Sequence, residues 1–394
     1  MTKKSTPLRF AHPFFTTTPM DLRPTVPGIG KRMIDYIVTK LEKIPDPLRD
    51  PTMMLEEIIG TQGVTDIKNA QVITFHAAGD TGHENGLMEE LVADAMAADY
   101  DIAHPAKSPA FFLHLGDVIY YHNTDLGYQS QFYVPYKNYP GKIIAIPGNH
   151  DGELFKFDGT STGQKTTLEA FMKNFCRQKT GVPRAAGTIY REMVSQPAVY
   201  WLLTAPFVDI IGLYSNIGEG PGFISGPTIG QKQKDWLIKT LTNINKARMK
   251  GDHKALLIAV HHPPLSYGGH ASSVDMLKDI DDAFNKAGIM PDALLAAHAH
   301  NYQRFTRFTT FNGKNMEIPF IVAGTGGRGI IGVPQASGAR DGDHTFDSSL
   351  VGYGYLTITV TAQQLTLSFT QVGQNKKSPF DKKIIVDLKT NRLL

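Results

Sequence analysis

The chain has 394 residues, enough to bury a large core in one big domain or two ordinary ones. Its 40 basic and 37 acidic side chains nearly balance, which argues against nucleic acid or an anionic membrane as a partner. The lone Cys176 excludes an intramolecular disulfide and a thiolate metal cluster. No apolar stretch has the length of a secretory signal or a membrane span, so we expect a soluble, cytoplasmic protein, with secretion as the alternative if a leader has been removed.

Residues 1–66 are predicted to form an N-terminal extension, and residues 67–394 the main domain. Within the extension, apolar residues recur at helical spacing from Met33 to Leu41, which predicts an amphipathic helix that packs on the domain or on a partner subunit. The pattern leaves the oligomeric state open.

From residue 71 onward, short apolar runs alternate with polar loops and helical patterns, which is typical of α/β layering. Strands are predicted at 72–75, 112–115, 142–146, 200–203, 208–213, 256–260, 294–297, 320–323, 355–360 and 365–369. Helices are predicted near 87–96, 168–175, 231–248 and 274–286. The strands at 200–203 and 208–213 resemble an antiparallel pair, and the long loops 152–196 and 214–230 are expected to lie over a site.

Five predicted strands end in a loop that carries Asp, Asn or His. These residues are Asp80, Asp117, Asn149 with His150, His261 with His262, and His298 with His300. Ligands bind at the carboxyl ends of strands in open α/β sheets, so five such endings in succession are hard to explain as ordinary turns. Oxygen ligands with neutral imidazoles suit Zn, Mn or Fe. Asp117 is well placed to bridge two cations, and His298 and His300 can diverge toward different ions.

Single residues of this series have plainer explanations. A lone aspartate at a strand end is usually a cap or turn residue, and His114, inside its strand, is more often a hydrogen-bonded core histidine than a ligand. The glycines between 324 and 329 make a weak phosphate cradle because no helical pattern follows them. A glycine-rich turn between strands explains that segment better.

Taken together and in order, the motifs resemble the calcineurin-like metallophosphoesterases and, within them, the purple acid phosphatases. The motifs, within residues 71–373, are Gly79-Asp80-Thr81-Gly82, Gly116-Asp117-Val118-Ile119-Tyr120, Gly148-Asn149-His150-Asp151, Val260-His261 and Ala297-His298-Ala299-His300. The resemblance implies a four-layer α/β/β/α sandwich of two mixed sheets, with a dimetal site on the strand-end loops of the catalytic domain, 67–394. The chain departs from the family pattern at Ala297, where glycine is usual, and at Gly82, where the wider superfamily has a histidine ligand.

The resemblance also implies a role for each site residue. One metal ion would bind Asp80, Asp117, Tyr120 and His300, and the other Asp117, Asn149, His261 and His298. Because Tyr120 replaces the missing ligand at Gly82 and a phenolate favours a hard trivalent ion, the expected pair is Fe(III) with Fe(II), Zn or Mn. The donor of a proton to the leaving group would be His150, oriented by Asp151, with His270 as the alternative donor.

The expected reaction is hydrolysis of a small phosphate monoester by a metal-bound hydroxide, as in acid phosphatases. The alternative is a phosphodiesterase that acts on cyclic nucleotides or other diesters. It would use the same metals but have an active-site entrance of a different shape. A catalytically silent metal-binding module is a third hypothesis, against which the intact His150 and His270 argue. The physiological ester is not encoded in these motifs.

Overall fold

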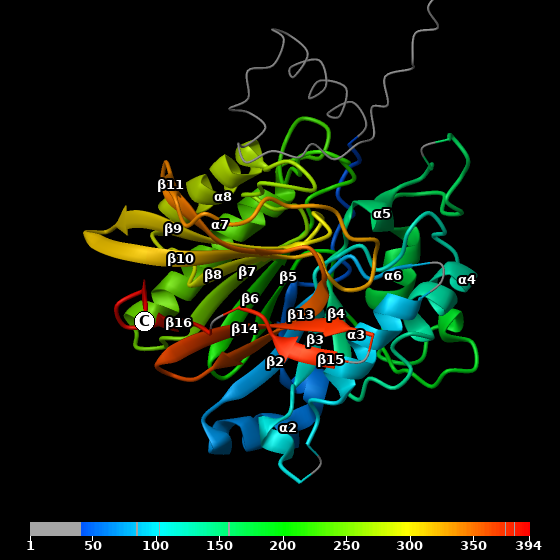
Figure 1. Ribbon diagram of the computed structural model, residues 1–394, viewed down its shortest axis with the longest axis horizontal. Helices are drawn as coiled ribbons and strands as arrows, with labels where there is room; N and C mark the ends of the chain where they lie inside the picture. Colours follow the sequence, from blue (N-terminus) through cyan, green and yellow to red (C-terminus); the bar gives the residue numbers. More distant parts are fainter. Residues whose placement is uncertain (1–40, 84–85, 102, 157, 375, 382) are drawn as a thin grey trace, which may run out of the picture.

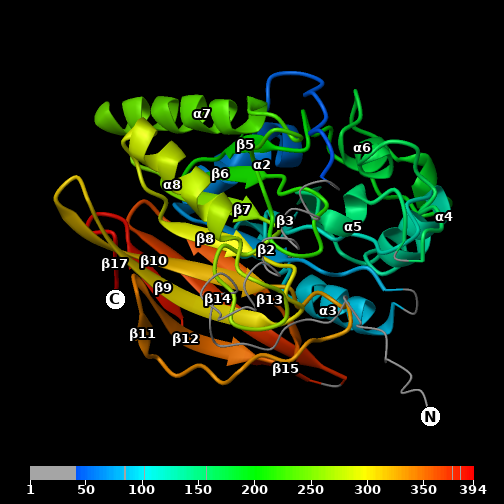
Figure 2. The ribbon, with the colours of Figure 1, turned by 90° about the horizontal axis from the view of Figure 1, so that it is seen from above.

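The computed structural model describes residues 41–394, apart from residues 84–85, 102, 157, 375 and 382. Two β-sheets lie face to face in this part of the chain, and helices cover the outer face of each sheet (Figure 1; Figure 2). Both sheets combine parallel and antiparallel strands. The predicted α/β sandwich of two mixed sheets is therefore confirmed.

The larger sheet has nine strands within the described residues. In order across the sheet these are β1 (Thr52–Met54), β5 (Trp201–Thr204), β6 (Val208–Leu213), β7 (Ala255–Val260), β8 (Ala293–Ala296), β10 (Lys314–Ala323), β9 (Tyr302–Phe311), β12 (His344–Leu350) and β11 (Arg340–Asp341). Strands β6, β7, β8 and β10 run parallel, and β5 and β6 form the predicted antiparallel pair. The carboxyl ends of these four parallel strands therefore point toward one edge of the molecule.

The smaller sheet contributes the other strand ends. Its order across the described chain is β17 (Arg392–Leu393), β16 (Ile384–Asp387), β14 (Gln364–Gly373), β13 (Tyr353–Val360), β2 (Ile73–Ala78), β3 (Phe111–His114) and β4 (Lys142–Ala145), with β15 (Lys376–Pro379) beside β14. Strands β2, β3 and β4 are parallel, and the remaining pairs are antiparallel. Apolar side chains from both sheets, such as Phe75, Leu113 and Leu257, form one buried core between them.

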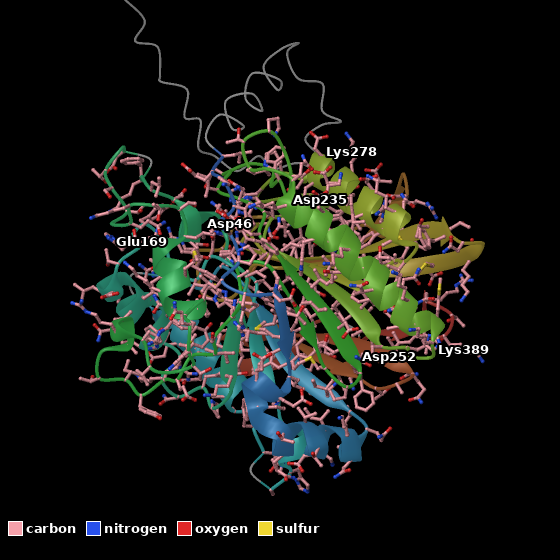
Figure 3. The ribbon with its side chains drawn as sticks, turned by 180° about the vertical axis from the view of Figure 1, so that it is seen from behind. Asp46, Glu169, Asp235, Asp252, Lys278 and Lys389 are labelled. Carbon is pink, nitrogen blue, oxygen red and sulfur yellow. The ribbon has the colours of Figure 1, made fainter. Side chains whose placement is uncertain are left out.

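Helices shield the two outer faces. Helices α7 (Lys232–Met249) and α8 (Val274–Ala287) cover the larger sheet (Figure 3), and α3 (Leu87–Ala97) packs on the smaller one. The shorter helical segments are α4 (Asp125–Tyr128), α5 (Asn149–Gly152), α6 (Glu169–Phe175), η2 (Pro105–Lys107), η3 (Gln129–Tyr133) and η4 (Arg184–Ala186). None of the helices in the described residues is long and apolar enough to cross a membrane.

The segment just before residue 66 is integrated into the sandwich. Strand β1 pairs in parallel with β5, and α2 (Glu56–Ala70) buries Ile58, Val64 and Ile67 in the core between the sheets. Strand β1 and residues 56–66 of α2 lie within the predicted N-terminal extension, and β1 forms an edge strand of the larger sheet. The amphipathic helix predicted from Met33 to Leu41 lies outside the described residues, apart from its last residue.

A polar cluster around Asp99 connects the end of α3 to the smaller sheet, and its contribution to stability depends on pH. Asp99 accepts hydrogen bonds from Tyr355 at 2.6 Å and Lys377 at 2.5 Å, and lies 3.2 Å from His76. Burial alone would raise the pKa of Asp99, but these partners lower it from 3.8 to about 2. A depressed carboxyl pKa stabilises the fold above pH 3.8, and this stabilisation is lost as the pH falls toward about 2.

We therefore expect Asp99→Asn to lower the free energy of unfolding at neutral pH by about 2 kcal/mol. Its difference from the wild type should shrink as the pH falls from 3.8 toward about 2, in denaturant titrations at a series of pH values. The exposed Asp235, changed to Asn, serves as the control. A difference that stays constant across this pH range would contradict the assignment.

Candidate metal centre

The predicted site residues meet where the parallel strands of both sheets end. The loops after β2, β3 and β4 carry Asp80, Asp117 and Asn149, and those after β7 and β8 carry His261 and His298. Backbone hydrogen bonds join these loops: the amide of Asp80 donates to Gly116, that of Ala297 to His261, and that of Gly79 to Ala323 in the other sheet. Segments far apart in the sequence are thereby held together at one edge of the sandwich.

One group of potential ligands centres on Asp80. Ligand atoms of Asp80, Asp117 and His300 all lie within 4.8 Å of one another. The hydroxyl of Tyr120 lies 3.1 Å from Asp80 Oδ1 and 3.1 Å from His300 Nε2. The structure thus brings together the four residues that the resemblance assigns to one ion.

A second group lies beside the first. Ligand atoms of Asp117, His261 and His298 also fall within 4.8 Å of one another. His261 Nε2 is 3.3 Å from Asp117 Oδ2 and 3.1 Å from Asn149 Oδ1. Asp117 therefore belongs to both groups, as expected of a carboxylate shared between two cations.

The donor atoms of this cluster fit metal ions. Asp80 Oδ2, Asp117 Oδ2 and His298 Nε2 are buried and have no hydrogen-bond partner among the described residues. Buried polar atoms without partners are rare in folded proteins because they lose their contacts with water and gain nothing in return. Carboxylate oxygens and imidazole nitrogens that converge in this way form a donor set for hard or borderline cations.

The backbone around these atoms is unusual. Four of the candidate ligands have left-handed backbone angles: Asp80 (φ 54°), Asp117 (φ 55°), His298 (φ 66°) and His300 (φ 49°). Two glycines permit the close packing, because a Cβ atom on Gly148 would lie 2.1 Å from Asp117 Oδ1 and one on Gly324 would lie 2.3 Å from Asp80 Oδ2. Non-glycine residues with such strained backbone angles are found most often at functional sites. Gly324 thus allows a close approach to the candidate ligand Asp80, in the connection between strands β10 and β11.

Charge and burial set the protonation of the cluster. Burial raises the pKa of Asp80 to about 7. Burial would also raise the pKa of Asp117, but the charges of His261 and His150 outweigh it and hold this pKa below its usual range. Burial and the neighbouring imidazoles lower the pKa of His298 well below 6.5, so this imidazole stays neutral and keeps a lone pair for a ligand bond.

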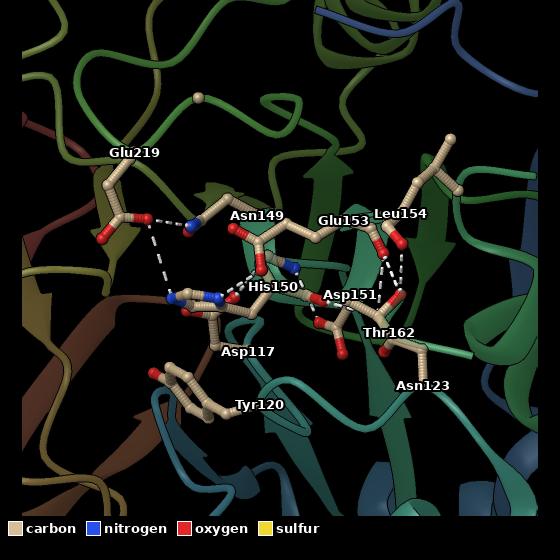
Figure 4. A network of polar contacts seen from close by, with 12 residues as sticks. Asp117, Tyr120, Asn123, Asn149, His150, Asp151, Glu153, Leu154, Thr162 and Glu219 are labelled. Carbon is tan, nitrogen blue, oxygen red and sulfur yellow. Dashed lines mark hydrogen bonds and ion pairs between the residues drawn. The ribbon is translucent and has the colours of Figure 1, made fainter. Parts of the chain in front are cut away.

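His150 lies above the cluster, and its partner differs from the predicted one (Figure 4). Its Nδ1 is 2.8 Å from the carboxylate of Glu153, which raises the pKa of His150 although burial opposes the shift. The predicted partner, Asp151, instead accepts hydrogen bonds from the amides of Gly148 and Val118 and braces two loops. Glu153 directly follows the helical turn α5, three residues after His150, which brings the two side chains together, whereas Asp151 is engaged with the amides of Gly148 and Val118.

Of the other histidines, His270 lies at the metal cluster, whereas His262 and His114 make structural hydrogen bonds. The ring of His270 lies 4.0 Å from that of His298, so this candidate donor is at the site. His262 has both ring nitrogens bonded, to Ser215 Oγ at 2.6 Å and to the carbonyl of Gly218 at 2.7 Å. His114 is likewise satisfied in the core, with Nε2 2.9 Å from Thr81 Oγ1. The contacts of His114 fit its expected role as a hydrogen-bonded core histidine, and those of His262 show that both of its ring nitrogens are occupied.

Three charged residues at the site, Glu153, Glu219 and Arg328, belong to none of the sequence motifs. Glu153 and Glu219 both approach His150, at 2.8 Å and 3.7 Å. The guanidinium of Arg328 lies over the ring of Tyr120, 4.2 Å from its centroid. Arg328 lies in the glycine-rich turn, and Glu153 and Glu219 lie in loops 152–196 and 214–230, which were expected to lie over a site, but no motif singled out these three residues.

A family model described as Calcineurin-like phosphoesterase matches residues 73–302. The chain therefore belongs to the calcineurin-like phosphoesterase family. It is a metal-dependent phosphoester hydrolase of that family, with groups of candidate metal ligands at the strand ends. A search among curated proteins gave no match.

Three solved structures show more distant likeness. PhoD has 13% sequence identity and a TM-score of 0.49, over 89% of this chain and 73% of PhoD. GAP50, the anchor in the inner membrane complex of Plasmodium, has 11% identity and a TM-score of 0.46, over 79% and 89% of the two chains. A dimetal phosphatase from Danio rerio has 13% identity and a TM-score of 0.41, over 78% and 98%. The family assignment rests on the family model alone.

Proposed function

We propose that this protein is a dimetal phosphatase of the purple acid phosphatase type, which hydrolyses phosphate monoesters. The observation that carries the proposal is the membership of Asp117 in two of the three groups of potential ligands found in the described residues, the third being His150, Glu153 and Glu219. One ion would be held by Asp80, Asp117, Tyr120 and His300, and the other by Asp117, Asn149, His261 and His298. When bound, such ions lower the pKa of water and neutralise phosphoryl oxygens.

The surrounding side chains would bind the substrate and move the proton. His150, held by Glu153 at its Nδ1, leaves Nε2 to face the substrate and to protonate the leaving-group oxygen. His270 is the alternative donor, since its ring also faces the cluster. Arg328 would add a positive charge for the phosphoryl oxygens, because its guanidinium lies over the ring of the candidate ligand Tyr120.

An assay with mono- and bis-p-nitrophenyl phosphate tests the substrate class. A monoesterase hydrolyses the first with the higher kcat/KM. A higher kcat/KM on the second compound would replace the proposal with a phosphodiesterase. Bound metal without turnover of either compound, or of a broad panel of phosphate esters, would revive the hypothesis of a silent metal-binding module.

The proposed metal pair, Fe(III) with Fe(II), Zn or Mn, has a spectroscopic test. A phenolate bound to Fe(III) gives a charge-transfer band in the visible, and the Tyr120 hydroxyl sits between Asp80 and His300. We expect purified protein to contain iron and to show this band, and Tyr120→Phe to lose it. Tyr121→Phe, at the neighbouring ring, is the control and should keep the band. Colourless wild-type protein with only zinc or manganese would contradict the iron assignment.

A further inference from the structure

Glu219 touches three site residues although it belongs to none of the sequence motifs. It belongs to the connection between β6 and α7. Its Oε2 atom accepts a hydrogen bond from Asn149 Nδ2 at 3.0 Å and lies 3.7 Å from His150 Nε2 (Figure 4). The backbone carbonyl of the same residue lies 3.2 Å from His270 Nδ1. One residue therefore contacts a candidate metal ligand and both candidate proton donors.

The loop that carries Glu219 is anchored by buried hydrogen bonds. The imidazole of His262 bonds Ser215 Oγ and the carbonyl of Gly218, directly before Glu219. Gly222, on the far side of Glu219, donates its amide to Ser273 Oγ and comes so close to His262 that a Cβ atom there would lie 2.6 Å from the histidine Cβ. The position of Glu219 thus follows from contacts with the segment that also supplies His261.

The contact with Asn149 fixes which end of that amide faces the metal cluster. A carboxylate only accepts hydrogen bonds, so it selects the NH₂ group of Asn149 and turns the amide oxygen the other way. That oxygen lies 3.1 Å from His261 Nε2, inside the second ligand group. Without the carboxylate the amide could rotate and present its NH₂ group, which cannot bind a cation.

We propose that Glu219 is a positioning residue. Its carboxylate holds the Asn149 amide with the oxygen toward the metal cluster, and it aligns the His150 ring from the Nε2 side. The inference rests on the proposed function, in which Asn149 binds an ion and His150 protonates the leaving group. The carboxylate acts through these two residues. The contact with His270 uses the backbone carbonyl, so a side-chain substitution leaves it in place.

The test compares Glu219→Ala with Glu219→Gln at a fixed free-metal concentration. Alanine removes the acceptor, so the affinity for the second metal ion and kcat should each fall about 10- to 100-fold, as is typical when the partner of a ligand is lost. Glutamine retains an amide oxygen that can accept from Asn149 Nδ2, so metal stoichiometry should stay near the wild-type value. Metal content by elemental analysis and kcat and KM from steady-state kinetics give separate readouts.

Two further variants isolate the contact. Glu153 bonds His150 Nδ1 and, with His150 and Glu219, forms a third group of potential metal ligands. Glu153→Ala should lower kcat and leave metal stoichiometry at the wild-type value if Glu219 acts through Asn149. A loss of metal in Glu153→Ala equal to that in Glu219→Ala would assign the loss to the third group and overturn the proposal. Asp235→Ala, on the exposed side of α7, should change neither quantity (Figure 3). Wild-type metal affinity in Glu219→Ala, or an equal loss of metal in Glu219→Gln, would overturn the proposal. If the wild type binds metal but hydrolyses no ester, the proposed function fails, and the difference in metal affinity still decides the role of Glu219.

Discussion

Replacing Asp117 with asparagine should abolish phosphoester hydrolysis and lower metal content at both proposed positions. Asp117 is the residue shared by the two ligand groups, and its Oδ2 has no hydrogen-bond partner among the described residues. An amide at this position removes the negative charge between the two cations and half of its oxygen donors. We expect kcat to fall about a thousandfold or more, because several kcal/mol of transition-state stabilisation depend on the metal charges.

The substitution is nearly isosteric, which separates loss of chemistry from loss of fold. The backbone amide of His150, which donates to Asp117 Oδ1 at 2.9 Å, can still donate to an asparagine oxygen. Thermal unfolding in the presence of chelator should therefore resemble that of the wild type, whereas elemental analysis should show loss of both ions. A fully active Asp117→Asn protein, or one that loses a single ion only, would refute the bridging role.

Replacing His150 with asparagine should reduce kcat by roughly 10²- to 10⁴-fold on alkyl phosphates, the range for loss of a general acid. The effect should be much smaller on p-nitrophenyl phosphate, whose leaving group needs little protonation. Metal stoichiometry should not change, because the His150 side chain belongs to neither ligand group that contains Asp117. The measurement is kcat/KM over a series of leaving groups of increasing basicity.

The same series applied to His270→Asn provides the matched comparison. His270 also faces the cluster but lacks a carboxylate partner on its ring, and its Nδ1 is 3.2 Å from a backbone carbonyl. A steeper dependence on leaving-group basicity in His150→Asn assigns the proton transfer to His150. If only His270→Asn shows the steeper dependence, the two roles must be exchanged.

The strand-end residues could be found from the sequence because each stands next to its own local signal. An apolar run predicts the strand, and the polar residue directly after it is then placed at the carboxyl edge. This reasoning located Asp80, Asp117 and His298, although it could not supply the distances between them. It failed for Glu219, whose contacts with Asn149 arise from a loop without periodicity, and loop paths depend on tertiary packing.

Other misses had signals that could have been used. The hairpin of β9 and β10 turns at Asn312-Gly313, both with positive φ, and this dipeptide is a strong hairpin signal between apolar runs. Glu153 could have been preferred to Asp151 had the Asn149–Gly152 segment been predicted as a helical turn, because residues three apart share a face. Strand β1 has only three residues, and its place is defined by pairing with β5.

The left-handed backbone at the candidate ligands has a consequence for how the chain matures. Such a conformation costs roughly 1–2 kcal/mol in each non-glycine residue, and the sequence accepts it at four positions in one small volume. The two sheets close upon each other at this same edge, through the backbone bond from Gly79 to Ala323. Final closure of the sandwich and capture of the ions are thus thermodynamically coupled, so the metal-free enzyme should fold but be less stable and more sensitive to proteases than the metal-loaded form.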